Sequence, residues 1–507
     1  MKKLVTPLLL LAGLHTAAAQ VSYQPPVFTD ENRAQKVSAL IPAVEKIYKE
    51  YAEKNHLPGM AWGIVVDGKL VASNGYGYTD VAKKVAATPK SLFRIASMSK
   101  SITAMGILKL REEGKLKLDD PVALYIPELK KSPALTKDAP SITIRHLLTH
   151  AAGFPEDNPW GDRQLADTEQ ELLDLLSTGI AYSNAPGLTY EYSNLGFAML
   201  GRIISVVSGK PYQQYLNERI FKPLSMENTV WEYEKAPAPL LAHGYRYEND
   251  AWSEEALLHD GIYGAMGGVI TSVEDFARYV AVHLDAWPPR DDRETGPVPR
   301  HAVREMHHPW NFTGMFNRPK KDGTPCMAAS AYAYGLAWNR YCDGKVSIAH
   351  SGGLPGFGSN WRILPEYGVG IISCANLTYA NMGYANSLVL DTLLTVLTPR
   401  KLPVSSVLEQ RKQALIPLLT NWSGAEKSGL FAENFFADQS VALREKHCRE
   451  VFARVGKITR ITALIPENQL RGAFRMEGEK GTIQVFFTLT PEHRPLIQQL
   501  DVWEAHR

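Results

Sequence analysis

The chain has 507 residues, of which 45% are hydrophobic and 21% are charged, and its formal net charge at pH 7 is +2. This length exceeds one compact domain, so we expect two or three folding units. The two fractions are those of an ordinary globular protein, and the small net charge without a long basic run argues against a nucleic-acid partner and a polybasic membrane patch.

The first 19 residues have the pattern of a secretory signal peptide. Lys2 and Lys3 precede an apolar run over residues 4–14, and the alanines at 17–19 form a small-residue cleavage site. The apolar run is too short to span a bilayer, and no later stretch is apolar enough to do so. We therefore expect an exported protein, periplasmic or secreted, without a membrane span.

A helix and a hairpin are predicted next along the chain. From residue 29 to about residue 54, apolar side chains recur at three-and-four spacing, which predicts an amphipathic helix. Residues 60–66 and 69–76 have the pattern of two strands, and the Asp-Gly pair between them is a strong hairpin signal. A further helix is expected to begin near Ser97.

The middle of the chain is mainly helical, and strands return before residue 400. The expected helices are 142–150, 169–176, 195–207, 212–220 and 386–398, and the expected strands are 334–341, 346–349, 360–364 and 369–375. Residues 154–168 and 287–325 lack periodicity and are predicted to be irregular loops, the first of them rimming a pocket. Because the strands fall at both ends of this region, we predict an antiparallel sheet flanked by helices, beside a helical subdomain.

A domain boundary is expected near residue 400, where prolines interrupt the pattern. Two predicted helices, 404–420 and 441–455, are followed by alternating runs over 457–464, 470–476, 482–489 and 495–503. This order predicts a small α+β domain in which no catalytic constellation is evident. The predicted organisation is a signal peptide at 1–19, a main domain at 20–399 and an accessory domain at 400–507.

The chain has four cysteines, and an exported protein can form disulfides between them. Cys326 and Cys342 bracket a strand-like segment and are the only pair close in sequence, so they are the candidate pair. Cys374 and Cys448 are expected to be small buried residues. None of the four has metal-site spacing, and neither a metal nor another cofactor is expected.

Catalytic chemistry is first indicated by Ser97-Met98-Ser99-Lys100. Positions three apart lie on one helix face, so the Ser97 hydroxyl and the Lys100 amine would be neighbours. Free backbone N–H groups and the helix dipole in the first turn favour a developing alkoxide. Burial would lower the pKa of Lys100, so that its neutral amine could accept the serine proton. Taken alone, this motif also fits a capping serine and a solvated lysine.

Two further motifs decide between these interpretations. Tyr192-Ser193-Asn194 follows a Pro-Gly turn and leads into a helix, and His350-Ser351-Gly352-Gly353 ends a predicted strand. With the first motif, they resemble the three signatures of serine β-lactamases and penicillin-binding proteins. The Tyr-x-Asn form is similar to the class C β-lactamase branch, which includes D-aminopeptidases, D-alanyl-D-alanine carboxypeptidases and esterases. The resemblance spans about residues 35–398 and implies a β-lactamase-like α/β (α+β) fold.

The resemblance implies a role for each motif residue. Ser97 would attack a carbonyl, Lys100 would be the base for that attack, and Tyr192 would pass the proton to the leaving group. The backbone N–H groups of Ser97 and Gly353 would form the oxyanion hole. The expected substrate-binding residues are Asn194, His350, Ser351, Gly352 and Gly353.

One departure from the family pattern concerns the substrate. Penicillin-recognising members usually have a lysine where this chain has His350, and a lysine is a permanent cation for a substrate carboxylate. We therefore expect a serine hydrolase acting through an acyl-enzyme on small esters or D-amino-acid amides and peptides. The alternatives are a β-lactamase, a D-alanyl-D-alanine carboxypeptidase, and, outside enzymes, an acylating binding protein or a non-catalytic scaffold. The sequence indicates no particular oligomeric state.

Other candidate motifs are weaker. Tyr247, Tyr379 and Tyr384 also begin Tyr-x-Asn, but the last two follow the third motif and the first lies at a predicted hairpin turn. His146 and His150 have the four-residue spacing of a metal site. The metalloprotease version requires a glutamate after the first histidine, and this chain has a leucine there, so we expect a structural helix.

Overall fold

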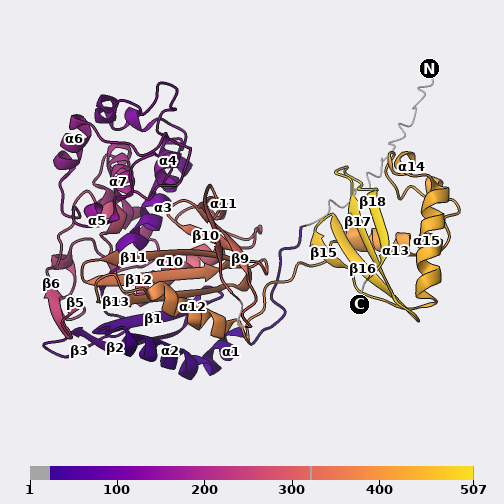
Figure 1. The fold of residues 1–507 in the computed structure, drawn as a ribbon, viewed down its shortest axis with the longest axis horizontal. Coiled ribbons are helices and arrows are strands. Elements are labelled where there is room, and N and C mark those ends of the chain that lie inside the picture. Colours follow the sequence, from indigo (N-terminus) through magenta and orange to yellow (C-terminus); the bar gives the residue numbers. More distant parts are fainter. Residues whose placement is uncertain (1–22, 320–321, 506–507) are drawn as a thin grey trace, which may run out of the picture. The chain divides into compact units, whose positions relative to one another are not determined.

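The computed structural model describes residues 23–319 and 322–505, so the predicted signal peptide lies outside the described residues. The chain forms two compact units. The larger unit spans Phe28–Arg400, and the smaller contains the residues from Lys401 onward together with the described residues before Phe28. Figure 1 draws the helices and strands of the smaller unit in yellow tones. Within the described ranges, no helix is both long and apolar enough to cross a bilayer.

The larger unit is built on a nine-stranded sheet in the order β3-β2-β1-β13-β12-β11-β10-β9-β8. All neighbouring strands are antiparallel, and β1 pairs with β13 with Met60 opposite Ala375. This pairing joins strands from the two ends of the region and confirms the predicted fold class. The strands are β1 (Gly59–Val66), β2 (Lys69–Asp80), β3 (Val85–Ala86), β8 (Asn311–Asn317), β9 (Met327–Tyr332), β10 (Ala337–Arg340), β11 (Val346–Leu354), β12 (Phe357–Leu364) and β13 (Val369–Ala375).

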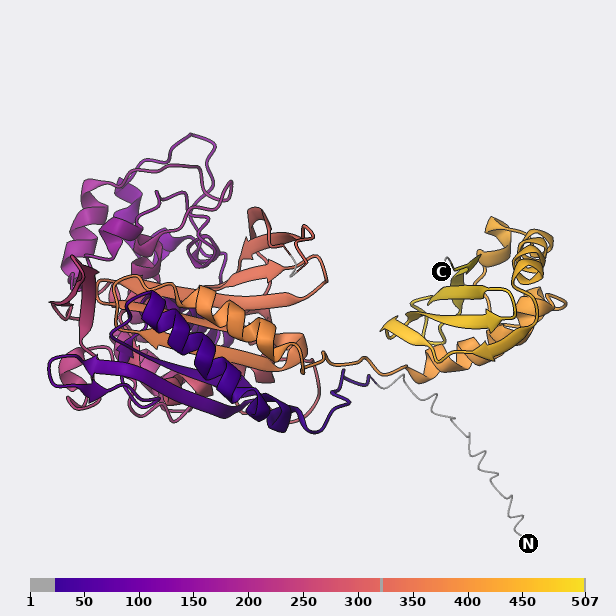
Figure 2. The same ribbon diagram turned by 60° about the horizontal axis from the view of Figure 1, so that its bottom comes forward.

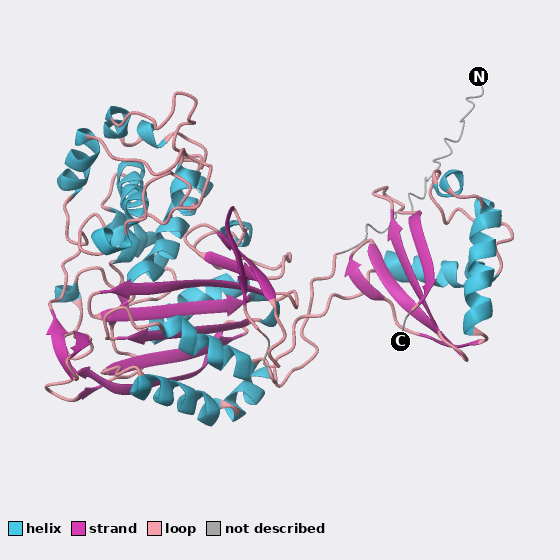
Figure 3. Cartoon of the chain, in the orientation of Figure 1, coloured by secondary structure: helices cyan, strands magenta, loops and turns pink. Residues whose placement is uncertain are grey.

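Helices cover both faces of this sheet. The central strand β1 is buried at every position, as expected for a strand that is covered on both faces. Met60 and Trp62 pack in one core with residues of α2 and α12, whereas Ala61 and Val65 belong to a second core with residues of α3 and α10. Successive side chains of a strand point to opposite faces, which explains this division. Figures 2 and 3 show α2 and α12 together on one face of the sheet. The helices are α1 (Arg33–Ala39), α2 (Ile41–Lys54), α3 (Ser99–Glu112), α10 (Val273–Asp285) and α12 (Met382–Leu393).

The predicted helical subdomain lies beside the sheet, and its two longest helices begin at capping residues. Thr168 and Glu171 form a reciprocal capping box at the start of α6, and the Ser193 hydroxyl accepts a hydrogen bond from the Gly196 N–H at the start of α7. Both signals were present in the sequence. The helices are α4 (Ile144–Leu148), α5 (Asn158–Gly161), α6 (Glu169–Thr178), α7 (Asn194–Ser208), α8 (Tyr212–Leu216) and α9 (Gly264–Gly267).

Residues 287–325 are not the irregular loop that the sequence predicted. They contain the helix α11 (Arg300–Met306) and the edge strand β8, and the next strand, β9, was also unpredicted. Most residues of β8 are exposed, so the strand has no alternation of apolar and polar positions that could reveal it. The candidate pair Cys326 and Cys342 forms a disulfide, with 5.3 Å between the Cα atoms, and Cys374 and Cys448 are free and buried.

The smaller unit is an α+β fold with its own hydrophobic core. Five strands form an antiparallel sheet in which apolar side chains of β16 and β17 alternate toward the helices α13 and α15. The strand β15 was not predicted. The elements are α13 (Ser406–Thr420), α14 (Phe435–Asp438), α15 (Val441–Val455), β14 (Ile458–Ile461), β15 (Ile465–Asn468), β16 (Arg471–Gly478), β17 (Thr482–Leu489) and β18 (Ile497–Glu504).

Candidate active site

Ser97 lies in the short 3-10 turn η1 (Ala96–Met98), directly before α3. The preceding residue, Ala96, has φ +49°, in the left-handed region that non-glycine residues rarely adopt. The turn brings the first motif together as the three-residue spacing predicted. The Nζ atom of Lys100 lies 3.0 Å from the Oγ atom of Ser97.

The amine of Lys100 is fully buried and has two further partners. Nζ lies 2.7 Å from Oδ1 of Asn194 and 3.1 Å from the carbonyl oxygen of Met266. Burial lowers the pKa of Lys100 to about 7, while the charges of Asp162 and Asp157 act in the opposite direction. A large share of the Lys100 side chains is therefore neutral at physiological pH.

Asn194 is held at the N-terminus of α7 by a carboxylate from the loop before α5. Asp157 accepts hydrogen bonds from the backbone N–H of Asn194 at 2.6 Å and from that of Leu195 at 2.9 Å. These N–H groups have no partner within the helix, so the carboxylate replaces one. Gly161 of α5 lies against Asn194. A Cβ atom at position 161 would be only 2.7 Å from the Cβ atom of Asn194, so a glycine is needed for α5 to pack this closely against α7.

The ring of Tyr192 lies beside the Lys100 amine, with 4.8 Å between Nζ and the ring centroid. Burial raises the pKa of Tyr192 well above its usual value, and a hydrogen bond with Ser97 lowers it. The ring also contacts His150, whose ring centroid is 4.2 Å away. Nδ1 of His150 accepts a hydrogen bond from the backbone N–H of Ser193, so His150 supports the second motif. The structure thus brings Ser97, Lys100, Tyr192 and Asn194 into one cluster.

His350 is held as a neutral imidazole. Its Nδ1 lies 2.6 Å from the carbonyl oxygen of Ser351, which can only accept, so Nδ1 bears the hydrogen. Nε2 is then the acceptor for the Tyr332 hydroxyl at 2.8 Å. Burial and the charge of Lys100 lower the pKa of His350 to about 3. The cation that a lysine would provide at this position is absent at neutral pH.

The remaining residues of the third motif form one wall of the site. β10 pairs with β11 only as far as Ala349, so the other edge of Gly352 and Gly353 is open to the cavity. A Cβ atom at Gly352 would lie 2.2 Å from the carbonyl oxygen of Ile95, so glycine is required where β11 passes the turn before Ser97.

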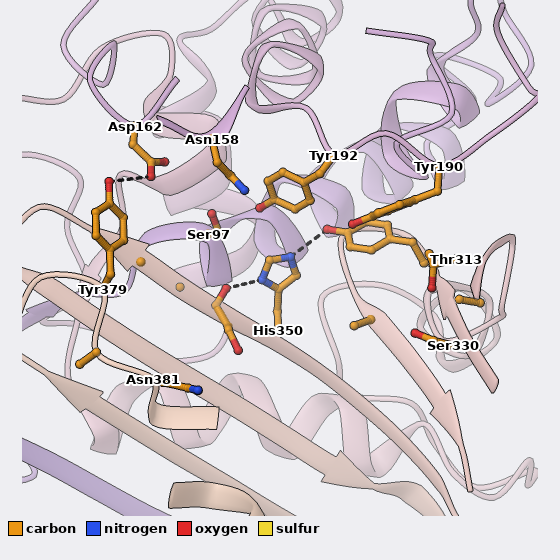
Figure 4. Close-up of a pocket in the computed structure, with 17 residues that line it drawn as sticks. Ser97, Asn158, Asp162, Tyr190, Tyr192, Thr313, Ser330, His350, Tyr379 and Asn381 are labelled. Atoms are coloured by element: carbon orange, nitrogen blue, oxygen red, sulfur yellow. Dashed lines mark hydrogen bonds between the residues drawn. The ribbon is translucent and has the colours of Figure 1, made fainter. Parts of the chain in front are cut away.

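These groups surround a cavity of about 570 Å³, shown in Figure 4. Several lining residues were not singled out from the sequence. Tyr379, whose Tyr-x-Asn motif follows the third motif in the chain, forms part of the wall and donates a hydrogen bond to Oδ2 of Asp162 at 3.2 Å. The cavity is lined by Ser97, Asn158, Asp162, Tyr190, Tyr192, Thr313, Ser330, Ala331, Tyr332, Ala337, His350, Ser351, Gly352, Gly353, Tyr379, Ala380 and Asn381.

Comparison with known proteins agrees with this geometry. The family model described as Beta-lactamase matches residues 44–394. The chain belongs to this family. Protein flp of Staphylococcus aureus (strain MW2) is 31% identical over 376 residues, which cover 73% of this chain and 69% of that protein. Unguisins hydrolase ungD' of Aspergillus campestris (strain IBT 28561) is 27% identical over 352 residues, covering 66% of this chain and 61% of that protein.

The protein also shares its fold with a solved structure. The octameric penicillin-binding protein homologue from Pyrococcus abyssi aligns with a TM-score of 0.58 at 22% identity, covering 92% of this chain and 98% of that chain. At this identity the likeness shows a shared fold, and the family membership rests on the match to the family model over residues 44–394.

His146 and His150, which have the spacing of a metal site, do not point to a common ligand position; each is hydrogen-bonded to a different part of the backbone. Nδ1 of His146 accepts a hydrogen bond from the backbone N–H of Thr143 at the start of α4, and Nδ1 of His150 accepts one from Ser193. Both imidazoles therefore serve to support backbone. Within the described ranges, no group of three or more His, Cys, Asp and Glu side chains is arranged to hold a metal ion.

Proposed function

We propose that this protein is a serine hydrolase whose nucleophile is Ser97 and whose general base is Lys100. The main support is the set of partners around the Lys100 amine. A neutral amine has two N–H groups and one lone pair, and two carbonyl-type acceptors, from Asn194 and Met266, can take both N–H groups. The lone pair is then left for the hydroxyl of Ser97 at 3.0 Å.

In the proposed reaction, the Ser97 oxygen bonds to the substrate carbonyl carbon as its proton passes to Lys100. The proton then moves through Tyr192 to the leaving group, and the bond between that group and the carbonyl carbon breaks. Water attacks the acyl group, releases the acid and restores the Ser97 hydroxyl. We assign the oxyanion hole to the backbone N–H groups of Ser97 and Gly353.

We propose small esters and D-amino-acid amides or peptides as the substrate class. The supporting observation is the neutral His350, which offers no permanent cation to the carboxylate of a β-lactam or a peptide C-terminus. The residues that line the cavity include neither lysine nor arginine. That one relative is named as a hydrolase of unguisins agrees with hydrolysis as the reaction type.

The test combines p-nitrophenyl acetate turnover with intact-mass spectrometry after addition of a penicillin. We expect wild type to hydrolyse the ester and Ser97→Ala to lose this activity while keeping the same thermal midpoint. Equal ester hydrolysis by Ser97→Ala would reject the assignment. With penicillin, unmodified protein beside hydrolysed drug would instead show a β-lactamase, and a persistent adduct on wild type alone would show a penicillin-acylated protein.

We also propose that the protein is exported, periplasmic or secreted, through the signal peptide at residues 1–19. The Cys326–Cys342 disulfide supports this proposal, since disulfides persist mainly in oxidising compartments. N-terminal sequencing of the protein recovered from a periplasmic extract or the culture medium tests it. A mature chain that begins near residue 20 is expected, and an uncleaved chain confined to the cytoplasm contradicts it.

A further inference from the structure

The charges around the cavity are uneven. Among the residues that line it, the only carboxyl group is that of Asp162, no lysine or arginine is present, and His350 is neutral. Asp162 is only 4% exposed and accepts a hydrogen bond from the Asn194 amide at 3.5 Å, and the ion pairs within 4.0 Å among the described residues do not include it. Lys100 is the cation that acts on this carboxyl group electrostatically, and Asp157 and Glu156 add further negative charge nearby. A buried carboxylate without an ion-pair partner is costly, so a cationic ligand group would be stabilised here.

Tyr379 is built into the wall beside this carboxyl group. Its hydroxyl donates to Oδ2 of Asp162, and its backbone N–H donates to the carbonyl oxygen of Phe357 at 3.1 Å. Its φ is +53°, which is unusual for a tyrosine. The ring lies close against Gly353, where an added Cβ would be 2.8 Å from a ring carbon. An ammonium group near this ring would gain a cation–π contact as well as the carboxylate charge.

The position of the pair relative to Ser97 indicates which part of the substrate it meets. In Figure 4, Asp162 and Tyr379 lie on one side of Ser97, while Tyr192 and His350 lie on the other. In the proposed reaction, Tyr192 supplies the proton to the leaving group, so that group departs on the Tyr192 side. The substituent of the acyl group therefore extends toward Asp162.

We infer that Asp162 and Tyr379 form a subsite for a positively charged amino group on the acyl part of the substrate. The preferred substrates are then esters or amides of amino acids with a free α-amino group. This inference rests on the proposed function and narrows it. Burial raises the pKa of Asp162 to about 6, opposed by the charge of Lys100, so the carboxyl group is mainly ionised at pH 7.5.

The test compares racemic alanine methyl ester with racemic N-acetylalanine methyl ester at pH 7.5, with the acid products measured by liquid chromatography and mass spectrometry. The two esters differ in the amino charge, and the racemates cover both configurations. We expect wild type to have at least tenfold higher kcat/KM for the free amine. In Asp162→Asn this ratio should fall at least tenfold, chiefly through KM for the free amine, and Tyr379→Phe should reduce it less.

The ratio of kcat/KM for the two esters separates an effect on binding of the amino group from an effect on the catalytic step. If Asp162 acted only by tuning Lys100, both esters would be affected equally, and the ratio would stay constant, which would overturn the inference. Asp260→Asn is the matched control, because burial also raises the pKa of Asp260 to about 6 but this residue does not line the cavity. Its ratio should equal that of wild type.

Two further outcomes keep the inference distinct from the proposed function. If wild type turns over p-nitrophenyl acetate but prefers the N-acetyl ester or cleaves neither methyl ester, the subsite is wrong and the serine hydrolase assignment stands. If Asp162→Asn does not fold, calorimetry on Ser97→Ala replaces the variant. Racemic alaninamide should then bind at least tenfold more tightly than racemic N-acetylalaninamide, and equal affinities would overturn the inference.

Discussion

The low pKa of Lys100 has a thermodynamic consequence that can be measured apart from activity. In the unfolded chain the lysine pKa is 10.5, and burial lowers it to about 7 in the folded protein. Between these values the unfolded state binds more protons than the folded state, so the free energy of unfolding rises with pH. The full shift of 3.5 units corresponds to about 5 kcal/mol, and the part between pH 7 and pH 9 to about 2 kcal/mol.

Lys100→Met removes the titrating amine and keeps a side chain of similar length. We expect this variant to be inactive, because Ser97 loses its base. The difference in unfolding free energy, wild type minus variant, should rise by about 2 kcal/mol from pH 7 to pH 9, because Lys100 is the group that the variant no longer titrates in this range. Urea unfolding at the two pH values measures this difference.

The kinetic counterpart uses wild type alone. Since only the neutral amine can accept the Ser97 proton, kcat/KM for p-nitrophenyl acetate should rise about tenfold per pH unit below pH 7 and level off above it. A stability difference that is independent of pH, together with a rate profile without a pKa between 6 and 8, would show that Lys100 remains protonated. The proposed role of Lys100 as the base would then be wrong.

Three further predictions concern the scaffold. Gly352→Ala should lower stability by about 1–3 kcal/mol and reduce ester hydrolysis, because the added methyl group meets the Ile95 carbonyl oxygen at 2.2 Å; unchanged urea midpoint and rate would contradict this. Replacing Cys326 and Cys342 by serine should lower the unfolding free energy by about 3 kcal/mol, since the bridge closes a loop of 16 residues, and an unaltered denaturation curve would count against it. Burial lowers the pKa of His307 to about 3, so its neutral form stabilises the protein above pH 6.5, and this contribution is lost as the pH falls toward 3. His307→Phe should therefore lose less stability than wild type between pH 6 and pH 4, and parallel urea curves would disprove it.

Much of the framework of the fold could be predicted from the sequence, because its signals are local. The three-and-four spacing that predicted residues 29–54 gives α1 and α2, and the Asp-Gly turn joins β1 to β2 as expected. The spacing of Ser97 and Lys100 placed both groups on one side of a helical turn. The order of the three motifs indicated the family. Each of these elements and each single motif depends on neighbours within a few residues, so the sequence pattern alone expresses it.

Elements with exposed or mixed surfaces were not predictable in this way. The edge strand β8 presents most of its side chains to solvent, so neither periodicity nor burial distinguishes it from a loop. Its place in the sheet follows from pairing with β9. The strand β15 likewise follows from pairing with β16. Strand pairing is a property of two segments, and it is absent from the pattern of either one.

The chemistry of the site was decided only by tertiary contacts. The sequence identified His350 as a departure from the family lysine, but the hydrogen bonds to Tyr332 and to the Ser351 carbonyl are what hold it neutral. Tyr379 had the wrong position for the second motif, yet it meets Asp162 from 217 residues away. That Ser97 and Lys100 would be neighbours was predictable from the chain, because their three-residue spacing is local. The charge inside the cavity could not be predicted from the chain, because it depends on burial and on partners that only folding brings together.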